Sequence, residues 1–212
     1  MDRKPRHRPG LNRRLRTFLA ALPVLAVIGA AGALPEDARA QDRTMLIDDF
    51  SRTDLVSALG TEWRGVSDRV MGGVSQESVS WTSPDGRAAL HLQGDVRLEN
   101  NGGFIQAALD LASGDSILNA SAYRGIRLMV RGNGETYSVH LRTPDNTRPW
   151  QSYRAEFTAV EEWQSIDLPF AEFTPYRLDA PLDTARLRRL GLVAIGRAFS
   201  ASLMVSSITL YR

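Results

Sequence analysis

Residues 126–142 have the sequence IRLMVRGNGETYSVHLR. Apolar and polar side chains alternate in 126–131 and again in 137–142, and Gly132-Asn133-Gly134 stands between these two runs. Alternation with a period of two places the apolar side chains on one face of a β-strand, and Gly and Asn are typical of tight turns. The stretch therefore predicts two strands joined by a hairpin turn. A nucleotide-binding loop is not indicated, because no helix pattern follows Gly134.

The same pattern extends outward along the chain. Further predicted strands are 45–50, 74–81, 88–93, 103–109, 151–157, 163–168, 190–195 and 202–211. Only 182–189, with Asp183 as its cap, and 55–59 have the pattern of short helices. About ten short strands separated by turns predict an all-β fold, a β-sandwich or a barrel. A parallel α/β fold needs long crossover helices, which the pattern lacks.

Composition limits the chemistry. The chain has 212 residues and no cysteine, which excludes disulfides, cysteine-ligated metals and a thiol nucleophile. Its net charge is +2, but residues 1–40 hold eight basic and three acidic residues. Residues 41–212 therefore hold 18 basic and 21 acidic residues, a net charge of −3. This acidic balance argues against a nucleic-acid partner.

The basic excess lies in a predicted secretory signal peptide, residues 1–40. Seven basic residues precede an apolar run at 18–34, and Ala38-Arg39-Ala40 precedes the expected cleavage point. The alternative is an uncleaved membrane anchor, but the run has 17 residues where a spanning helix needs about 20. Arg13-Arg14 leaves a twin-arginine export route open. We expect one exported domain, 41–212, in the periplasm or outside the cell, with membrane contact only through an uncleaved leader.

Residues 63–75, WRGVSDRVMGGVS, and 98–104, LENNGGF, are the most unusual motifs. Together with later blocks such as YRGI at 123–126 and EW at 162–163, they resemble the complex I intermediate-associated protein 30 family. The resemblance spans nearly all of 48–212. The family more often has Asp where Asn133 stands, and 175–181 lacks a common Arg-Gly step.

The resemblance implies a galactose-binding-like jelly-roll β-sandwich and a non-enzymatic binding or assembly-factor role. The namesake assists assembly of respiratory complex I on the matrix side, which corresponds to the bacterial cytoplasm. The leader predicts the opposite side of the membrane. The complex I role is therefore not carried over intact, and we expect a protein partner in the envelope.

The two glycine-rich motifs predict a candidate binding edge. Gly72 and Gly73 permit positive φ or close backbone approach, and Asp68 can accept N–H groups of a turn. Met71 supplies an adaptable apolar tip. A second such turn contains Asn100 and Asn101. The two turns would form a ligand-binding edge if they lie side by side, or else only an internal Asp/Asn hydrogen-bond network.

Other candidates are Arg131, Tyr137, Arg142 and Trp150. Arg131 and Arg142 end neighbouring predicted strands, next to Tyr137, and would form one outward basic surface suited to carboxylates. The alternative is that they are solvated or paired with acidic residues. An exposed Trp150 ring could stack on a sugar, which makes a carbohydrate-binding module the alternative function.

No catalytic, metal or cofactor site is predicted. His91 and His140 lie on strands without a metal-ligand spacing, and the chain has no Gly-x-Ser-x-Gly motif. We therefore expect a protein that is not an enzyme and has no cofactor. The sequence leaves open whether the domain binds a calcium ion.

Overall fold

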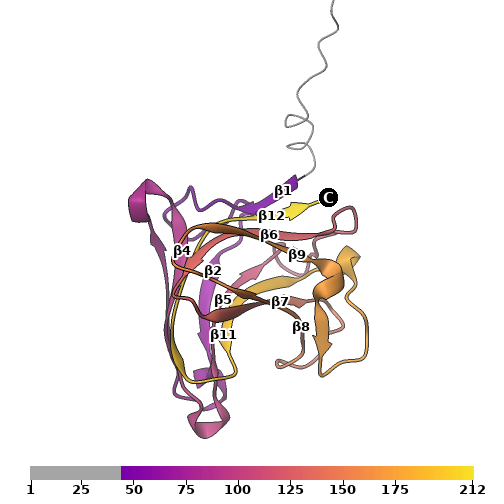
Figure 1. Cartoon of the computed structure of the whole chain (residues 1–212). Helices are drawn as coiled ribbons and strands as arrows, with labels where there is room; N and C mark the ends of the chain where they lie inside the picture. Colours follow the sequence, from indigo (N-terminus) through magenta and orange to yellow (C-terminus); the bar gives the residue numbers. More distant parts are fainter. Residues whose placement is uncertain (1–43) are drawn as a thin grey trace, which may run out of the picture. The chain divides into compact units, whose positions relative to one another are not determined.

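The computed structural model describes residues 44–212 as two six-stranded antiparallel sheets that pack face to face (Figure 1). The expected all-β sandwich is confirmed. The predicted signal peptide, 1–40, lies outside the described residues, so its cleavage near Ala40 stays a prediction. No helix among the described residues is long and apolar enough to cross a membrane.

The first sheet contains the two ends of the domain. Its strand order is β3 (Gln76–Thr82), β4 (Ala89–Val96), β12 (Phe199–Tyr211), β6 (Gly125–Gly132) and β9 (Gln164–Pro169). β1 (Thr44–Asp48) pairs antiparallel with the end of β12, where Thr44 lies opposite Tyr211.

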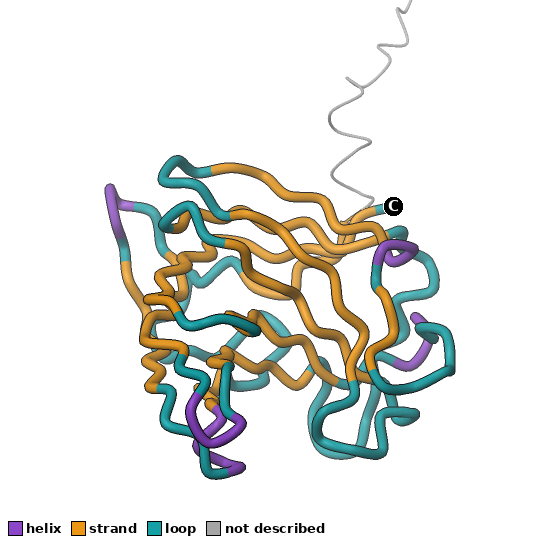
Figure 2. The backbone as a smooth tube through the Cα atoms, turned by 60° about the horizontal axis from the view of Figure 1, so that its bottom comes forward, coloured by secondary structure: helices purple, strands orange, loops and turns teal. Residues whose placement is uncertain are grey.

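The second sheet has the order β10 (Thr174–Tyr176), β8 (Ser152–Thr158), β7 (Thr136–Arg142), β11 (Arg189–Ile195), β5 (Phe104–Asp110) and β2 (Trp63–Ser67). Five short 3₁₀ helices lie at strand ends (Figure 2): η1 (Asp68–Met71), η2 (Pro84–Gly86), η3 (Glu99–Asn101), η4 (Phe170–Glu172) and η5 (Thr184–Arg186).

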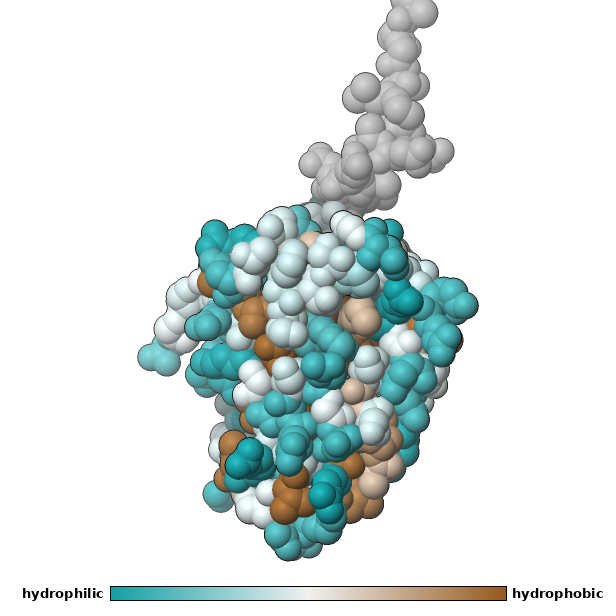
Figure 3. All heavy atoms as spheres, turned by 90° about the vertical axis from the view of Figure 1, so that its left-hand side faces the viewer, coloured by the Kyte–Doolittle hydropathy of each residue, from teal (hydrophilic) through white to brown (hydrophobic). Residues whose placement is uncertain are grey.

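The core lies between the sheets and follows the predicted alternation. In β6, Ile126, Leu128 and Val130 are fully buried, and in β7 Val139 and Leu141 are too. The alternate residues of each strand face outward. The side of the domain in Figure 3 is mainly hydrophilic, with hydrophobic side chains interspersed, because the strands turn most of their apolar residues inward.

The predicted hairpin differs from the structure in one respect that matters for the site. β6 and β7 follow each other through Gly132-Asn133-Gly134, yet they belong to opposite sheets. Gly132 donates its N–H to Val160, and Gly134 donates to Ala159, so the turn packs on the segment after β8. Alternation identifies the buried face of each strand but not its neighbour, and the prediction of a hairpin was therefore wrong.

The two predicted helices are also largely replaced by other structure. Residues 55–59 form turns, in which Leu55 has a φ of 58° that an α-helix does not allow. In 182–189 only η5 is helical, and β11 already begins at Arg189. The predicted cap is confirmed, since Asp183 accepts the N–H of Ala185 at 3.0 Å.

Candidate functional site

Asp68 joins the two glycine-rich turns from inside. Its side chain is fully buried, and its carboxylate accepts the N–H and hydroxyl of Ser75 at 2.9 and 2.5 Å. It also accepts the N–H groups of Gly103 at 2.6 Å and Phe104 at 3.3 Å. The two turns therefore lie side by side, as one of the sequence interpretations expected. Burial favours a raised pKa for Asp68, but these hydrogen bonds outweigh it and hold the pKa below its ordinary value.

The glycines of both motifs make room for this carboxylate. A Cβ at Gly73 would lie 2.3 Å from Asp68 Cγ, and one at Gly102 would lie 2.5 Å from Asp68 Oδ2. Gly72 has a φ of 92°, in the left-handed region that favours glycine. Asp68, Gly72 and Gly73 thus build the turn, and the Asp68 carboxylate is not offered to a ligand.

The outer side of the same turns is exposed and partly apolar. Val70 is 76% exposed and Met71 58% exposed, in η1. Asn100 and Asn101, in η3, are exposed with positive φ values of 59° and 58°. Of these four residues, Val70, Met71 and Asn101 line a groove that begins here.

The groove, of about 770 Å³, lies on the outer face of the second sheet. Side chains that alternate with core residues of β5, β7, β8 and β11 form its floor. The turns at Met71 and Asn101 border it on one side, and β10 with the loop before β8 borders it on the other. Its lining includes Val66, Phe104, Gln106, His140, Arg142, Trp150, Gln151, Ser152, Arg154, Tyr176, Arg177, Arg189, Val193 and Ile195.

The groove has an apolar end and a basic end, which the strand register defines. At the first end, Ile195 of β11 lies opposite Phe104 of β5. At the second, Arg189 of β11 lies opposite Arg142 of β7, and Arg154 of β8 lies opposite His140. Burial lowers the pKa of Arg142, and the neighbouring Arg189 and Arg188 lower it further.

Arg142 also holds the loop that presents Trp150. Its guanidinium donates to the carbonyls of Asn146 at 3.1 Å, Arg148 at 3.0 Å and Pro149 at 3.1 Å. The Trp150 side chain is 50% exposed at the border of the groove. Among the described residues, Trp150 takes part in no ring–ring and no cation–π contact. Trp163 and Tyr176, in contrast, each lie against an arginine guanidinium.

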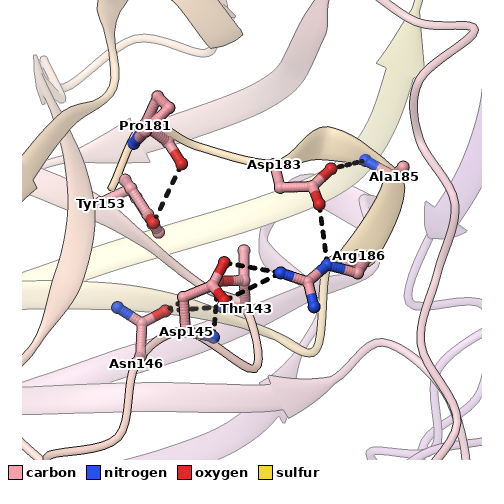
Figure 4. A network of polar contacts seen from close by, with 8 residues as sticks. All are labelled: Thr143, Asp145, Asn146, Tyr153, Pro181, Asp183, Ala185 and Arg186. Carbon is pink, nitrogen blue, oxygen red and sulfur yellow. Dashed lines mark hydrogen bonds and ion pairs between the residues drawn. The ribbon is translucent and has the colours of Figure 1, made fainter. Parts of the chain in front are cut away.

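A second network fixes the start of this loop (Figure 4). Arg186 of η5 donates to both carboxylate oxygens of Asp145 at 2.8 Å and to Asp183 at 2.7 Å. Thr143 donates its N–H to Asn146 Oδ1 at 2.6 Å. The loop between β7 and β8 is thereby tied to the segment that leads into β11.

The comparisons with known proteins agree with this architecture. The model of the complex I intermediate-associated protein 30 (CIA30) family matches residues 49–204. The chain belongs to the CIA30 family. No curated protein matches the chain.

Solved structures similar to this CIA30 domain include carbohydrate-binding modules. One is the family 11 module from Clostridium thermocellum in complex with a β-1,3-1,4-mixed-linked tetrasaccharide. It is 16% identical with a TM-score of 0.59, and the match covers 80% of this chain and 95% of the module. A family 30 module is 14% identical with a TM-score of 0.56, over 79% and 87% of the two chains. At these identities the likeness establishes the jelly-roll β-sandwich fold alone.

Six of the ten candidates expected from the sequence lie outside the groove lining: Asp68, Gly72, Gly73 and Asn100 of the glycine-rich turns, and Arg131 and Tyr137. Arg131 is on the outer face of the first sheet, where it pairs with Asp85 at 3.1 Å. Arg142 belongs to β7, which is in the second sheet. Arg131 cannot share a surface with Arg142, and that expectation was wrong. Tyr137 is 1% exposed and faces the core.

The hydroxyl of Tyr137 links strands of both sheets. It donates to Asn133 Oδ1 at 2.6 Å and accepts the N–H of Ser202 at 2.9 Å. Burial raises the pKa of this phenol to about 12. Asn133, which stands where the CIA30 family more often has Asp, also donates to the carbonyl of Ser200 at 2.8 Å. These contacts give both residues a structural role.

Sequence reasoning missed several residues that the groove brings together: Phe104, Gln106, His140, Arg154, Tyr176 and Arg189. All but Tyr176 and Arg189 occupy outward positions of strands that the alternation did predict, and Arg189 lies in the segment 182–189 that was predicted as a helix. Tyr176 lies on β10, a three-residue exposed edge strand with no pattern to detect. The signal that could have found most of them was the set of residues that face away from the core on each predicted strand. What was lacking was the strand order that puts these sets next to one another.

His140 is a buried polar side chain of the groove floor. Burial, and then the charge of Arg154, lower the pKa of its imidazole to about 3, so the ring is neutral at pH 7. Its Nε2 has no hydrogen-bond partner among residues 44–212. Within the same residues, no three His, Asp or Glu side chains gather as a metal site would require. The arrangement offers binding groups, with aromatic, basic and amide side chains around one groove.

Proposed function

We propose that this CIA30 domain is a non-catalytic glycan-binding module that acts in the bacterial envelope, and that the groove on the second sheet is its binding site. The observation that carries the proposal is the half-exposed Trp150 indole at the border of a groove of about 770 Å³. Amphipathic aromatic rings beside hydrogen-bonding groups suit sugars, which present apolar ring faces and polar edges.

The rest of the lining supports this function. Gln106, Gln151 and Ser152 provide amide and hydroxyl groups for sugar hydroxyls. The family 11 module, solved with a bound tetrasaccharide, supports the proposal at the level of fold only. The export pattern in residues 1–40 supports a location where envelope or extracellular glycans are present.

The test is a glycan array followed by titration calorimetry on the mature domain. We expect micromolar to millimolar binding of at least one oligosaccharide, because the groove has room for several sugar rings. Trp150→Ala should weaken that binding at least tenfold, since it removes the exposed ring. Val160→Ala is the matched control, because Val160 is 37% exposed and lies outside the groove lining.

The proposal is wrong if no glycan binds, or if Trp150→Ala and Val160→Ala bind equally well. Fractionation of cells that express the full chain tests the location. Recovery of the domain in the cytoplasm would contradict the envelope part of the proposal.

A second candidate function is docking of a protein partner, as an assembly factor or chaperone would require. The observation that favours it is the exposure of three large apolar side chains at the joined turns: Val70 (76%), Met71 (58%) and Leu98 (51%). Apolar side chains held outward by a rigid turn are typical of protein contacts.

Crosslinking from position 98, at the same turns, in whole cells tests this candidate. A partner that is captured by the parent domain and lost in Val70→Asp, but kept in Val160→Asp, would support docking at these turns. Equal capture by both variants would rule it out. Asp68 is unsuitable for this test, because its loss would disturb the turn itself.

A further inference from the structure

The charges in the groove differ from those of the rest of the domain. Four arginines line it, Arg142, Arg154, Arg177 and Arg189, and none of the described lining residues is Asp or Glu. The domain as a whole is acidic, with a net charge of −3 in residues 41–212. The groove is therefore a local basic site on an acidic molecule.

Elsewhere among the described residues, several arginines pair with carboxylates, although others, such as Arg69 and Arg124, lie in no ion pair there. Arg127 pairs with Asp167 at 2.6 Å, Arg52 with Asp54 at 2.5 Å, and Arg186 with Asp183 at 2.7 Å. Arg189, at the basic end of the groove, pairs with Asp110 at 2.7 Å. Arg142 and Arg154 have no such ion pair among residues 44–212.

The contacts of these two arginines leave their charge uncompensated. Arg142 donates to three neutral carbonyls, as described above. Arg154 donates its Nε to Ser152 Oγ at 2.9 Å, and its guanidinium lies 3.5 Å from the centre of the Tyr176 ring. The terminal nitrogens of Arg154 have no hydrogen-bond partner among the described residues. Both side chains are half-buried, and burial lowers the pKa of each.

An anion in the groove would compensate this charge. A guanidinium has a planar set of donors that matches carboxylate and sulfate oxygens, and such charge-assisted hydrogen bonds are among the stronger polar contacts. Removing charged groups from water is costly unless they are paired. The unpaired terminal nitrogens of Arg154 are thus available for a ligand. They lie next to the Tyr176 ring, in the groove that Trp150 also lines.

We propose that the glycans bound by this groove are anionic, with carboxylate or sulfate groups contacted by Arg154 and Arg142 while Trp150 packs on a sugar ring. This inference rests on the proposed function, because it names the ligand class of the same site. The apolar end at Phe104 and Ile195 then accommodates less polar parts of the chain.

The experiment compares four probes by titration calorimetry at 50 mM and 200 mM NaCl. They are an oligogalacturonate, a chondroitin sulfate oligosaccharide, a neutral mixed-linked β-glucan oligosaccharide of equal length, and a single-stranded oligonucleotide. We expect at least one of the two anionic glycans to bind tenfold or more tightly than the neutral one. That binding should weaken severalfold at the higher salt concentration, because exposed charge pairs are screened. The stronger of the two anionic probes identifies the acid group.

Arg154→Gln should remove most of the preference for the anionic glycan, so that binding of the anionic glycan weakens at least tenfold more than binding of the neutral one. Trp150→Ala should weaken both. Arg127→Gln is the matched control, since Arg127 lies on the outer face of the first sheet. Denaturant midpoints of all variants check that they are folded.

Three outcomes would overturn the inference. If neutral and anionic glycans bind equally well, or Arg154→Gln keeps the preference, the charge has no role, and the glycan-binding function still stands. If no glycan binds, the function fails and the inference with it. If the oligonucleotide binds more tightly than either anionic glycan, the basic end recognises phosphates of another class of partner.

Discussion

At the residue scale, Asp68 illustrates how a motif can be read correctly in its geometry and incorrectly in its use. The Gly72-Gly73 and Asn100-Asn101 turns were expected either to form a binding edge side by side or to serve only an internal hydrogen-bond network, and the structure places them together around the buried Asp68 carboxylate. The direction of the carboxylate was not predictable, because it depends on whether Gly103 and Phe104 reach it across 35 residues of chain. Met71 was expected as an apolar tip of the turn, but the exposure of Val70 beside it was not expected.

Asp68→Asn should destabilise the domain by about 2 kcal/mol, because it replaces charge-assisted hydrogen bonds with weaker ones and leaves a mismatched N–H donor inside. Urea unfolding at pH 7 measures this. Asp115→Asn, at an exposed position, is the control and should change the free energy of unfolding little. A loss equal to that of the control would contradict the structural role of Asp68.

The same carboxylate predicts a pH dependence. The folded pKa of Asp68 lies below its ordinary value of 3.8, so its stabilising contribution is present above about pH 4 and is lost as the pH falls through the folded pKa. Unfolding measured from pH 5 to pH 2 should show a smaller loss of stability in Asp68→Asn than in the parent. Parallel curves would contradict this prediction.

His140 acts in a different pH window. The folded pKa is about 3, while the unfolded ring titrates near 6.5, so the unfolded state takes up a proton first as the pH falls. The domain should therefore lose stability between about pH 6.5 and pH 3. His140→Gln should reduce the difference in the free energy of unfolding between pH 7 and pH 5. His91→Gln, the other histidine of lowered pKa, measures how much of that difference comes from elsewhere.

At the element scale, strands were predictable where apolar inward residues alternate with polar outward ones. They were not predictable where pairing with a neighbouring strand imposes the extended backbone. β2 was missed because Trp63 and Ser67 are buried while Arg64 and Gly65 between them are exposed, which breaks the alternation. Its extended shape comes from pairing with β5. The order of strands within a sheet is a long-range property, and for this reason the assignment of β6 and β7 to one hairpin failed.

The loop between β7 and β8 gives a prediction for the elements around the groove. Arg186→Ala removes the contacts to Asp145 and Asp183 that tie this loop to η5. Hydrogen exchange should become faster in residues 143–151 and at the N–H of Ala185, while the strands of the first sheet keep their protection. Arg212→Ala, at the chain end, is the control. Unchanged exchange in 143–151 would mean that Arg142 alone fixes the loop.

At the scale of the whole domain, the class of fold was predictable and the site was only partly so. Period-two alternation and the absence of crossover helices were sufficient for an all-β sandwich or barrel, and the family resemblance favoured the sandwich. The groove collects residues from all six strands of one sheet and from loops distant in sequence, and no local pattern records this convergence. Met71 and Asn101 were among the expected residues because they precede conspicuous glycines. Arg142 was expected because it ends a predicted strand, and Trp150 because it stands beside Pro149 near a strand start.

The pairing of β1 with β12 predicts that the domain tolerates circular permutation. Thr44 lies opposite Tyr211, so a short glycine–serine linker can join the two ends. New ends at Gly114, in the exposed part of the long connection between β5 and β6, leave the groove lining uncut. The permutant should unfold cooperatively within about 1 kcal/mol of the parent and keep its glycan affinity. Loss of cooperative unfolding would contradict this expectation.

The same pairing determines how the domain would respond to a pulling force. Because Thr44 and Tyr211 lie at the same end of an antiparallel pair, tension applied to the two ends would load the β1–β12 hydrogen bonds one after another rather than all at once. The pair would open like a zipper, at low force. Ile47, which is fully buried in the core, would be the first buried residue of β1 to resist, followed by Asp48, which accepts the Trp63 indole N–H at 2.7 Å. The second sheet, with the groove, would be shielded from the load until the first sheet had begun to separate.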